Sequence, residues 1–336
     1  MGHAAPVRNT REEVLFKPRP CSRLSAQLSG QAMEPRLELP YRFTSESGWR
    51  RHLEEEGYVV LAGALSPEEV EAAKGLLWTD LESAYAQHGL SRSDVRTWAR
   101  WPLSKSGLNT AVTQDQGAWF VRGCPGVRHA FQEIFNKPDL IVSMDALIIW
   151  RPWWIDGSWR PVTEGLHLDQ NPFQKPGLET VQGMVALFPV TPSTGGLEVV
   201  PRSHTPAALA ELKREFPFWD GKGDFCLLGR TDGRSVLLHA APGDLILWDS
   251  RTTHGGKVGS GDLQSPELAR LAVTVAMVPR ARASQEVLRT RVAGFQEGKT
   301  FNHSPHEAGT STGTLASRST KRHDLAELSE AQRALL

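Results

Sequence analysis

The chain has 336 residues, with 38 Lys or Arg and 38 Asp or Glu, so its formal net charge at pH 7 is zero. A chain of this length can bury a substantial core, in one large domain or in two ordinary ones. The balanced charge argues against nucleic acid or an anionic membrane as the main partner, because both require a strongly basic surface.

Three cysteines, Cys21, Cys124 and Cys226, lie far apart in the chain and lack the spacing of a metal site. They do not form a disulfide framework, and reduced thiols fit an intracellular protein. No apolar run approaches the length of a membrane span, and the N-terminal segment has no hydrophobic signal core. The sequence therefore predicts a cytoplasmic protein.

Helix signals come first along the chain. Residues 1–43 contain scattered prolines without a steady period, which predicts a flexible leader. A strong helix start follows at Ser66, which can cap the helix, and Glu69 completes a capping box. Further helices are predicted at residues 47–56, 127–135, 206–214 and 324–335, and a polar loop at residues 104–117.

Strand signals dominate the middle of the chain. Segments such as 271–278 are apolar on both faces, which suits two packed sheets with helices outside one of them. The pattern predicts a mainly β fold with flanking helices, a double-stranded β-helix or jelly roll, over residues 44–284. Residues 285–336 are predicted to be a loosely ordered C-terminal segment with a short helix. The predicted strands are 57–61, 141–150, 164–169, 181–190, 196–200, 235–240, 244–250 and 270–278.

A candidate metal site stands out among these strands. His167 and Asp169 lie on one short strand, and residues i and i+2 of an extended chain point to the same face. His254 follows another strand and can close the site. Two imidazoles and one carboxylate form the facial triad associated with non-haem Fe(II) oxygenases. Alone, the His-x-Asp pair is more typical of a surface histidine and an Asx turn before Pro172 than of a metal site.

Other histidines compete for the same role. His204 and His239 also follow strand-like runs, but His239 fits a core histidine with satisfied hydrogen bonds better than a ligand. The two glycines after His254 allow the backbone to approach closely, which favours His254 as the ligand.

Arg270 opens an apolar strand beyond His254. A buried arginine needs a partner, and its planar guanidinium suits bidentate binding of a carboxylate. Arg270 can therefore hold the distal end of a dicarboxylic cosubstrate. The alternatives are a salt bridge between Arg270 and Glu267 or Asp262, and Lys257 as the cation that holds the cosubstrate.

Several motifs between residues 48 and 280 form a recognisable set. They are EGYVVL at 56–61, LSPEEV at 65–70, GGLEVVPRSH at 195–204, and the run from Gly243-Asp244 to His254. In this order they resemble the phytanoyl-CoA dioxygenase family of Fe(II)- and 2-oxoglutarate-dependent oxygenases. Two departures stand out: Arg202 replaces a usual glycine, and Arg270 lies further beyond His254 than the family's arginine, with an inserted loop at 259–262.

The resemblance implies a specific chemistry. Fe(II) would be bound by His167, Asp169 and His254, and 2-oxoglutarate would chelate the iron and pair its 5-carboxylate with Arg270. Reaction with dioxygen would hydroxylate a C–H bond of a small-molecule substrate and release succinate and carbon dioxide. The carboxylate of Asp169 favours hydroxylation, because related halogenases lack it.

Two alternatives stay open from the sequence. One is a metal-dependent jelly-roll isomerase or epimerase that does not use 2-oxoglutarate, and the other is a non-catalytic binding or sensor protein of the same fold. The segments 150–159, rich in tryptophan, and 104–117 are predicted to line the substrate entrance. The sequence indicates neither the substrate, including whether it is a coenzyme A thioester, nor the oligomeric state.

Overall fold

The computed structural model of the protein describes residues 42–46, 48–309, 318–319 and 321–336. All of these residues belong to one compact unit, Glu34–Leu336. The predicted leader lies outside the described residues except for its last two positions.

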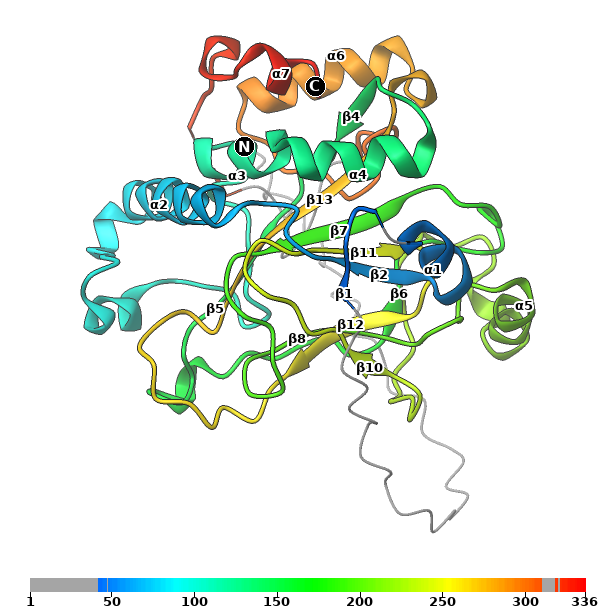
Figure 1. The fold of residues 1–336 in the computed structure, drawn as a ribbon, viewed down its shortest axis with the longest axis horizontal. Coiled ribbons are helices and arrows are strands. Elements are labelled where there is room, and N and C mark those ends of the chain that lie inside the picture. The colour runs from blue at the N-terminus through cyan, green and yellow to red at the C-terminus, as the bar shows by residue number, and fades with distance from the viewer. Residues whose placement is uncertain (1–41, 47, 310–317, 320) are drawn as a thin grey trace, which may run out of the picture. The chain divides into compact units, whose positions relative to one another are not determined.

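Two sheets form the framework of this unit (Figure 1). The larger sheet has the order β1-β2-β11-β7-β13-β5-β3, with β4 paired to β13, and the smaller has the order β10-β8-β12-β6-β9. The strands of the larger sheet are β1 (Arg42–Phe43), β2 (Tyr58–Leu61), β3 (Leu108–Asn109), β4 (Leu140–Val142), β5 (Leu147–Trp150), β7 (Val181–Ala186), β11 (Leu245–Asp249) and β13 (Arg270–Pro279). Those of the smaller sheet are β6 (His167–Leu168), β8 (Gly195–Val199), β9 (Cys226–Leu227), β10 (Val236–Leu237) and β12 (His254–Val258).

Side chains alternate between two cores because successive residues of a strand point to opposite faces. On β11, Ile246 and Trp248 pack against residues of the smaller sheet such as Val199. Leu245 and Leu247 of the same strand join the core that includes the helices. The larger sheet is thus buried on both faces, and the predicted jelly roll with flanking helices is confirmed.

Helices cover the outer face of the larger sheet. In Figure 1, α2, α3 and α4 lie along that face, and α6 lies beyond them. The α-helices are α1 (Trp49–Glu56), α2 (Pro67–Ala84), α3 (Gln116–Gly123), α4 (Pro125–Phe135), α5 (Pro206–Glu215), α6 (Gln285–Gln296) and α7 (Glu330–Arg333). Short 3-10 helices are η1 (Ala86–His88), η2 (Val95–Arg100), η3 (Gly157–Trp159), η4 (Pro217–Trp219), η5 (Arg280–Arg282) and η7 (Leu325–Glu327).

The start of α2 follows the predicted capping box. The amide of Glu69 donates to Oγ of Ser66 at 3.2 Å, and the amide of Ser66 donates to Oε2 of Glu69 at 2.8 Å. These two bonds satisfy amides that a helix start otherwise leaves unpaired. The helix then buries Leu77 and Leu81 completely in the core.

Some strand boundaries differ from the prediction. The predicted strand 141–150 is two strands, because the chain leaves the sheet between β4 and β5, where the buried Arg122 binds the carbonyl of Asp145 at 2.9 Å. His254 does not merely follow a strand but begins β12, whose glycines gave no strand signal in the sequence. The predicted loop 104–117 contains β3 and the first residues of α3.

The two ends of the described chain are more ordered than predicted. Arg42, assigned to the leader, pairs in β1 and binds the buried carboxylate of Asp244 at 2.6 Å. The prediction of a loosely ordered segment after residue 284 was wrong for α6. Arg291 on α6 is fully buried and donates to carbonyls of the core, including Val142 at 2.5 Å. Such contacts join distant segments and leave no local pattern in the sequence.

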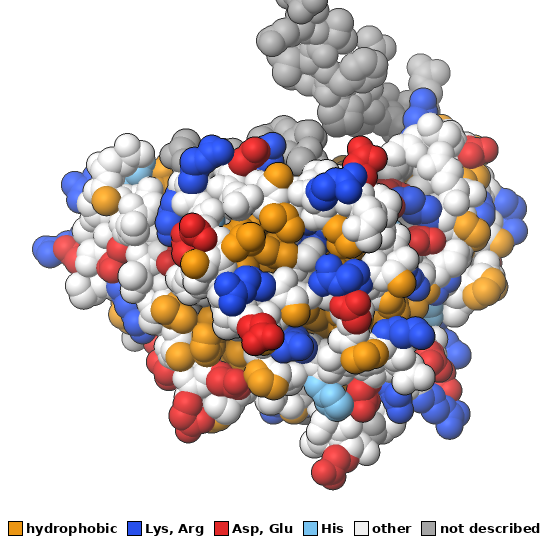
Figure 2. Space-filling view, turned by 90° about the horizontal axis from the view of Figure 1, so that it is seen from above, with side chains coloured by type: hydrophobic (Ala, Val, Ile, Leu, Met, Phe, Trp, Pro, Cys, Tyr) orange, Lys and Arg blue, Asp and Glu red, His pale blue; other side chains and the backbone are white. Residues whose placement is uncertain are grey.

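The described residues contain no helix that is both long and apolar enough to span a membrane. On the face seen in Figure 2, cationic and anionic side chains are interspersed, as the balanced composition leads us to expect.

Candidate metal centre

The smaller sheet brings the two predicted histidine ligands together. His167 on β6 and His254 on β12 are direct register partners in an antiparallel pair, and their ring centroids lie 4.4 Å apart. Leu168, between His167 and Asp169, points the other way into an apolar cluster beneath α5. The alternation therefore directs His167 and Asp169 to the same face.

The three predicted ligands converge on one point of this face. One ligand atom from each of His167, Asp169 and His254 lies within 4.8 Å of the other two. Nε2 of His254 is 3.3 Å from Oδ2 of Asp169, and Nε2 of His167 is 3.9 Å from Oδ1. Distances of this size are what three ligands of one ion require when each lies about 2.0–2.2 Å from it.

Backbone carbonyls orient both imidazoles. Nδ1 of His167 lies 2.9 Å from the carbonyl of Gly165, and Nδ1 of His254 lies 2.9 Å from the carbonyl of Thr252. A carbonyl only accepts, so each Nδ1 carries the proton and each Nε2 presents a lone pair to the centre. A hydrogen bond from the ring nitrogen that does not bind the metal is the usual way in which a protein orients a metal-binding histidine.

The protonation states also suit metal binding. Burial, with the neighbouring His254, lowers the pKa of His167, so the ring stays neutral. Burial raises the pKa of Asp169, but His303, His254 and His167 outweigh this effect and hold that pKa well below its usual range. A neutral imidazole and an ionised carboxylate are the forms that bind metals.

Gln182 is a site residue that the sequence did not reveal. It lies on β7, is 6% exposed, and donates from Nε2 to Oδ2 of Asp169 at 3.1 Å. It comes from the larger sheet, and nothing in its own segment marks it as part of a site.

Arg270 is buried without an anionic partner. Its guanidinium lies 4.7 Å from the ring centroid of Trp150 and donates to Sδ of Met184 at 3.0 Å, while Nε has no partner among the described residues. Burial lowers its pKa to about 10, so it stays a cation at neutral pH. Neither Glu267 nor Asp262 forms an ion pair with it in the described structure. An unpaired buried cation is costly, which makes Arg270 a fitting partner for a bound carboxylate.

The other candidates are engaged elsewhere. Lys257 pairs with Glu198 at 3.7 Å. Nε2 of His204 lies 3.0 Å from the carbonyl of Glu54, and His239 is half-buried next to β10. None of the three belongs to the ligand cluster.

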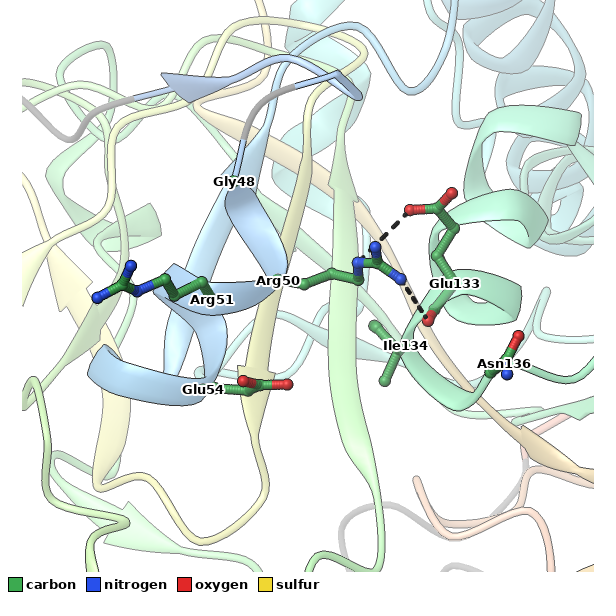
Figure 3. Close-up of a pocket in the computed structure, with 7 residues that line it drawn as sticks. All are labelled: Gly48, Arg50, Arg51, Glu54, Glu133, Ile134 and Asn136. Atoms are coloured by element: carbon green, nitrogen blue, oxygen red, sulfur yellow. Dashed lines mark hydrogen bonds and ion pairs between the residues drawn. The ribbon is translucent and has the colours of Figure 1, made fainter.

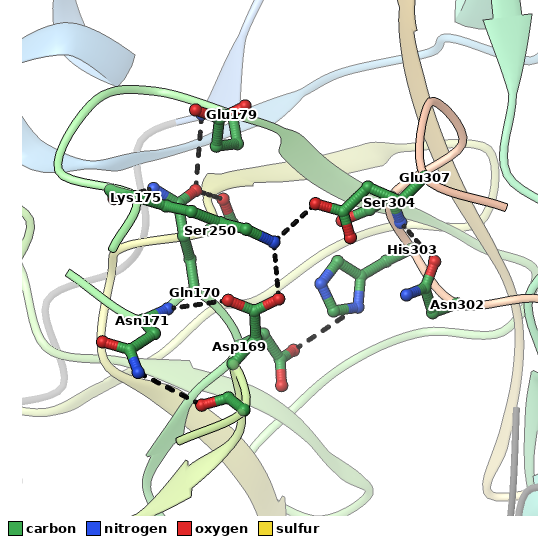
Figure 4. Close-up of polar contacts among 12 residues, drawn as sticks. Asp169, Gln170, Asn171, Lys175, Glu179, Ser250, Asn302, His303, Ser304 and Glu307 are labelled. Atoms are coloured by element: carbon green, nitrogen blue, oxygen red, sulfur yellow. Dashed lines mark hydrogen bonds and ion pairs between the residues drawn. The ribbon is translucent and has the colours of Figure 1, made fainter. Parts of the chain in front are cut away.

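His303 is the second residue that the sequence did not reveal. Its Nδ1 lies 4.0 Å from Oδ2 of Asp169 (Figure 4). It belongs to the segment between α6 and residue 309, which was expected to be loosely ordered. No spacing signal relates a histidine so far along the chain to the triad.

A separate surface pocket lies between α1 and α4 (Figure 3). There Nε of Arg50 is 3.8 Å from a carboxylate oxygen of Glu133. The pocket shares no residue with the triad.

The chemistry of the converging donors fits a divalent transition metal. Two imidazole nitrogens and one carboxylate oxygen suit Fe(II) with positions left open. A model of the phytanoyl-CoA dioxygenase (PhyH) family matches residues 104–262, a stretch that includes the whole triad. Residues 104–262 are thus similar to the phytanoyl-CoA dioxygenase family.

Individual relatives are distant. Ava biosynthesis cluster protein O of Aspergillus versicolor is 28% identical over 297 residues, covering 82% of this chain and 92% of that protein. The epimerase SnoN, solved with Fe3+, alpha-ketoglutarate and nogalamycin RO, has 15% identity and a TM-score of 0.47, over 80% of this chain and 96% of that one. The non-heme monooxygenase ThoJ, solved as a nickel complex, has 14% identity and a TM-score of 0.44, over 83% and 92%. Likenesses of this size do not bear on the substrate or reaction.

Two features distinguish this chain from the phytanoyl-CoA dioxygenase pattern. Arg202, which replaces the usual glycine, has a φ of 63°, so the turn keeps the left-handed backbone that glycine favours. Arg270 and His303 both lie beyond the residues that match the family model. The approach of His303 to Asp169 is therefore a property of this fold and not of the match.

Proposed function

We propose that this chain is an Fe(II)- and 2-oxoglutarate-dependent dioxygenase that hydroxylates a C–H bond of a small-molecule substrate. The observation that carries the proposal is the convergence of His167, Asp169 and His254 within 4.8 Å on one face of a jelly roll. The match to the phytanoyl-CoA dioxygenase family supports it.

The protein's first task is to hold the metal with room for other ligands. His167, Asp169 and His254 would bind Fe(II) from one side and leave the remaining positions for 2-oxoglutarate and dioxygen. When bound, Fe(II) with 2-oxoglutarate and dioxygen would supply the chemistry that converts a C–H bond to an alcohol, with one oxygen atom in the alcohol, the other in succinate, and carbon dioxide released.

Arg270 has the task of holding the cosubstrate. Its guanidinium sits between Trp150 and Met184 on the inner face of the larger sheet. The bound 5-carboxylate of 2-oxoglutarate would neutralise this cation and accept hydrogen bonds from it. Such charge-assisted bonds are stronger than neutral ones, and stronger still where water is excluded.

The side of the triad formed by His254 is shielded from water. The indole ring of Trp248 lies 5.2 Å from the ring of His254, and His254 is 3% exposed. A dry site strengthens the electrostatic interactions of the ligands and protects a reactive centre from side reactions.

An aerobic succinate-release assay with Fe(II) and a panel of metabolites tests the proposal. The expected result is succinate formation that requires metal and dioxygen and is stimulated by at least one metabolite. Reaction under labelled dioxygen should place one labelled atom in that product. Turnover of a metabolite without succinate would support the metal-dependent enzyme that does not use 2-oxoglutarate. Metal binding without any oxygen consumption across the panel would support a binding or sensor protein.

A further inference from the structure

We propose that Phe225 and His303 determine which substrate this site accepts. The substrate is a neutral small molecule that presents a flat apolar face to Phe225 and a hydroxyl or carbonyl group to His303. This inference rests on the proposed function, and it concerns the residues around the triad, not the triad itself.

Two exposed apolar side chains lie beside the triad. Leu227 on β9 is the register partner of His167, so its side chain lies on the same face. Cys226 points to the opposite face, where it is buried with Leu166 and Leu168. By alternation Phe225 shares the face of Leu227, and its ring centroid is 5.2 Å from that of His167.

These two side chains are unusually open for their type. Phe225 is 50% exposed and Leu227 is 43% exposed. Single exposed apolar residues are common, but two on the same face beside a metal triad are typical of a ligand-binding surface. A flat apolar molecule that covered the ring of Phe225 would remove this surface from water next to His167.

His303 lies beside Asp169 with its ring nitrogens available. Its ring points toward Asp169 (Figure 4), it is 21% exposed as a side chain, and it forms no hydrogen bond with another described residue. The segment that carries it is fixed to the larger sheet, since the amide of Phe301 donates to the carbonyl of Met144 at 2.8 Å. A ring nitrogen of His303 is therefore free to hydrogen-bond to a polar group of the substrate.

Lys175 forms ion pairs with both segments that carry the proposed substrate contacts. Nζ of Lys175 is 2.7 Å from Asp224, which precedes Phe225, and 2.5 Å from Glu307 in the segment of His303. Figure 4 shows Lys175 extended toward Glu307. One ammonium thus joins the loop after Asp169 to both proposed substrate contacts.

The same ion pairs indicate the charge of the substrate. Two carboxylates neutralise Lys175, so it is not available to bind a phosphorylated or carboxylated substrate. Lys175 thus offers no free charge to an anionic group of the substrate, which favours a neutral molecule.

A paramagnetic binding experiment tests the inference on the full chain loaded with Ni(II) and 2-oxoglutarate. The probes are 2-naphthol, which has a flat apolar face and one hydroxyl, and naphthalene, which lacks the hydroxyl. Nickel close to a bound probe broadens its proton resonances, and the same protein loaded with Zn(II) supplies the diamagnetic reference. We expect nickel-dependent broadening of 2-naphthol, with weaker binding of naphthalene.

Variants separate the two contacts. Phe225→Ala should weaken both probes by about tenfold, the effect of losing roughly one ring of apolar contact. His303→Ala should weaken 2-naphthol alone, by about two- to tenfold, and His303→Gln should restore much of the loss. Phe218→Ala removes a phenylalanine of η4 that is more exposed than Phe225, and it should change neither affinity.

The outcomes are distinguishable from a failure of the proposed function. Calorimetry first shows whether Ni(II) and 2-oxoglutarate bind, and absence of that binding would overturn the dioxygenase proposal together with the inference. If both bind but 2-naphthol shows no nickel-dependent broadening, the inference alone is wrong. Equal effects of Phe225→Ala and Phe218→Ala, or equal loss of both probes in His303→Ala, would also overturn it.

Discussion

Gln182 and Asp169 join the two sheets at the candidate centre. The amide of Gln182 on β7 of the larger sheet donates to Oδ2 of Asp169, which follows β6 of the smaller sheet, at 3.1 Å. A ligand carboxylate with a fixed hydrogen bond keeps one orientation toward its metal. The distance between the sheets and the geometry of the triad are therefore linked through one side chain.

Replacement of Gln182 should weaken metal binding without removing a ligand. Gln182→Leu keeps the volume of the side chain but loses the donor, and loss of such a partner typically costs about 10–100-fold in metal affinity. Titration with Co(II), followed by its visible absorption, measures the change. Gln132→Leu, which alters a partly exposed glutamine on α4, serves as the control. Equal affinities in the two variants would contradict the role of Gln182.

Removal of a proposed ligand should abolish turnover of 2-oxoglutarate. Asp169→Ala and His167→Ala each remove one of the three proposed protein ligands, so metal affinity and the turnover that depends on it should be lost. Succinate release with Fe(II) should fall to the level of the metal-free protein. His129→Ala, at an exposed histidine of α4, should retain full turnover. Normal turnover in either ligand variant would refute the assignment.

Substitution of Arg270 should separate cosubstrate binding from metal binding. Arg270→Leu removes hydrogen bonds to a carboxylate that contribute about 1.5–3 kcal/mol, so the 2-oxoglutarate requirement should rise by roughly 10–150-fold. Co(II) affinity should stay the same. Since the guanidinium is buried without an anion, the variant without ligands should also melt at the same temperature or higher.

The opposite pattern would identify Arg270 as a structural residue. A large loss of stability with an unchanged 2-oxoglutarate requirement would move the cosubstrate role elsewhere. Lys257→Met, at the other cation considered, should leave the requirement unchanged because Lys257 already pairs with Glu198.

Asp80 on α2 should make stability depend on pH. Burial raises its pKa to about 6 from 3.8, and the hydrogen bond from the amide of Gly117 offsets only part of this shift. Between these two values the folded chain binds a proton more readily than the unfolded chain, so stability falls as the pH rises through this window. Asp80→Asn should therefore raise the melting temperature at pH 8, and the gain should shrink toward pH 4. A gain independent of pH would contradict this explanation.

Lys175 should control the mobility of the segment that carries His303. Lys175→Met breaks the ion pairs to Asp224 and Glu307, while partly exposed pairs contribute only about 0–1 kcal/mol to global stability. Amide hydrogen exchange in residues 300–309 should accelerate by up to about fivefold, the factor that ~1 kcal/mol corresponds to. Lys74→Met breaks an ion pair with Glu71 on α2 and should leave the exchange of residues 300–309 unchanged. Unaltered exchange in Lys175→Met would show that the hydrogen bond of Phe301 alone holds the segment.

Local signals explain which features were predictable. The capping box of Ser66 and Glu69 and the i, i+2 pair of His167 and Asp169 depend only on near neighbours, so their geometry follows from the chain itself. β12 escaped prediction because Gly255 and Gly256 carry no strand signal; they pair with Glu198 and Leu197 only in the assembled sheet. The order of α6 was not predicted, because an arginine such as Arg291 is usually a surface residue. Here it is buried and donates to the carbonyls of Val142 and Leu335, which lie far away in the sequence.

The sequence by itself determined the jelly-roll pattern and the three side chains proposed as ligands, because alternation along strands is a local property of the backbone. Only the tertiary structure decided that Gln182 orients Asp169, that Arg270 is buried without a counter-ion, and that His303 reaches the site. Each of these depends on segments distant in the chain packing together, and no spacing in the sequence encodes which buried groups will meet. The order of the C-terminal segment was decided in the same way, by burial of α6 against a core built from residues far before it.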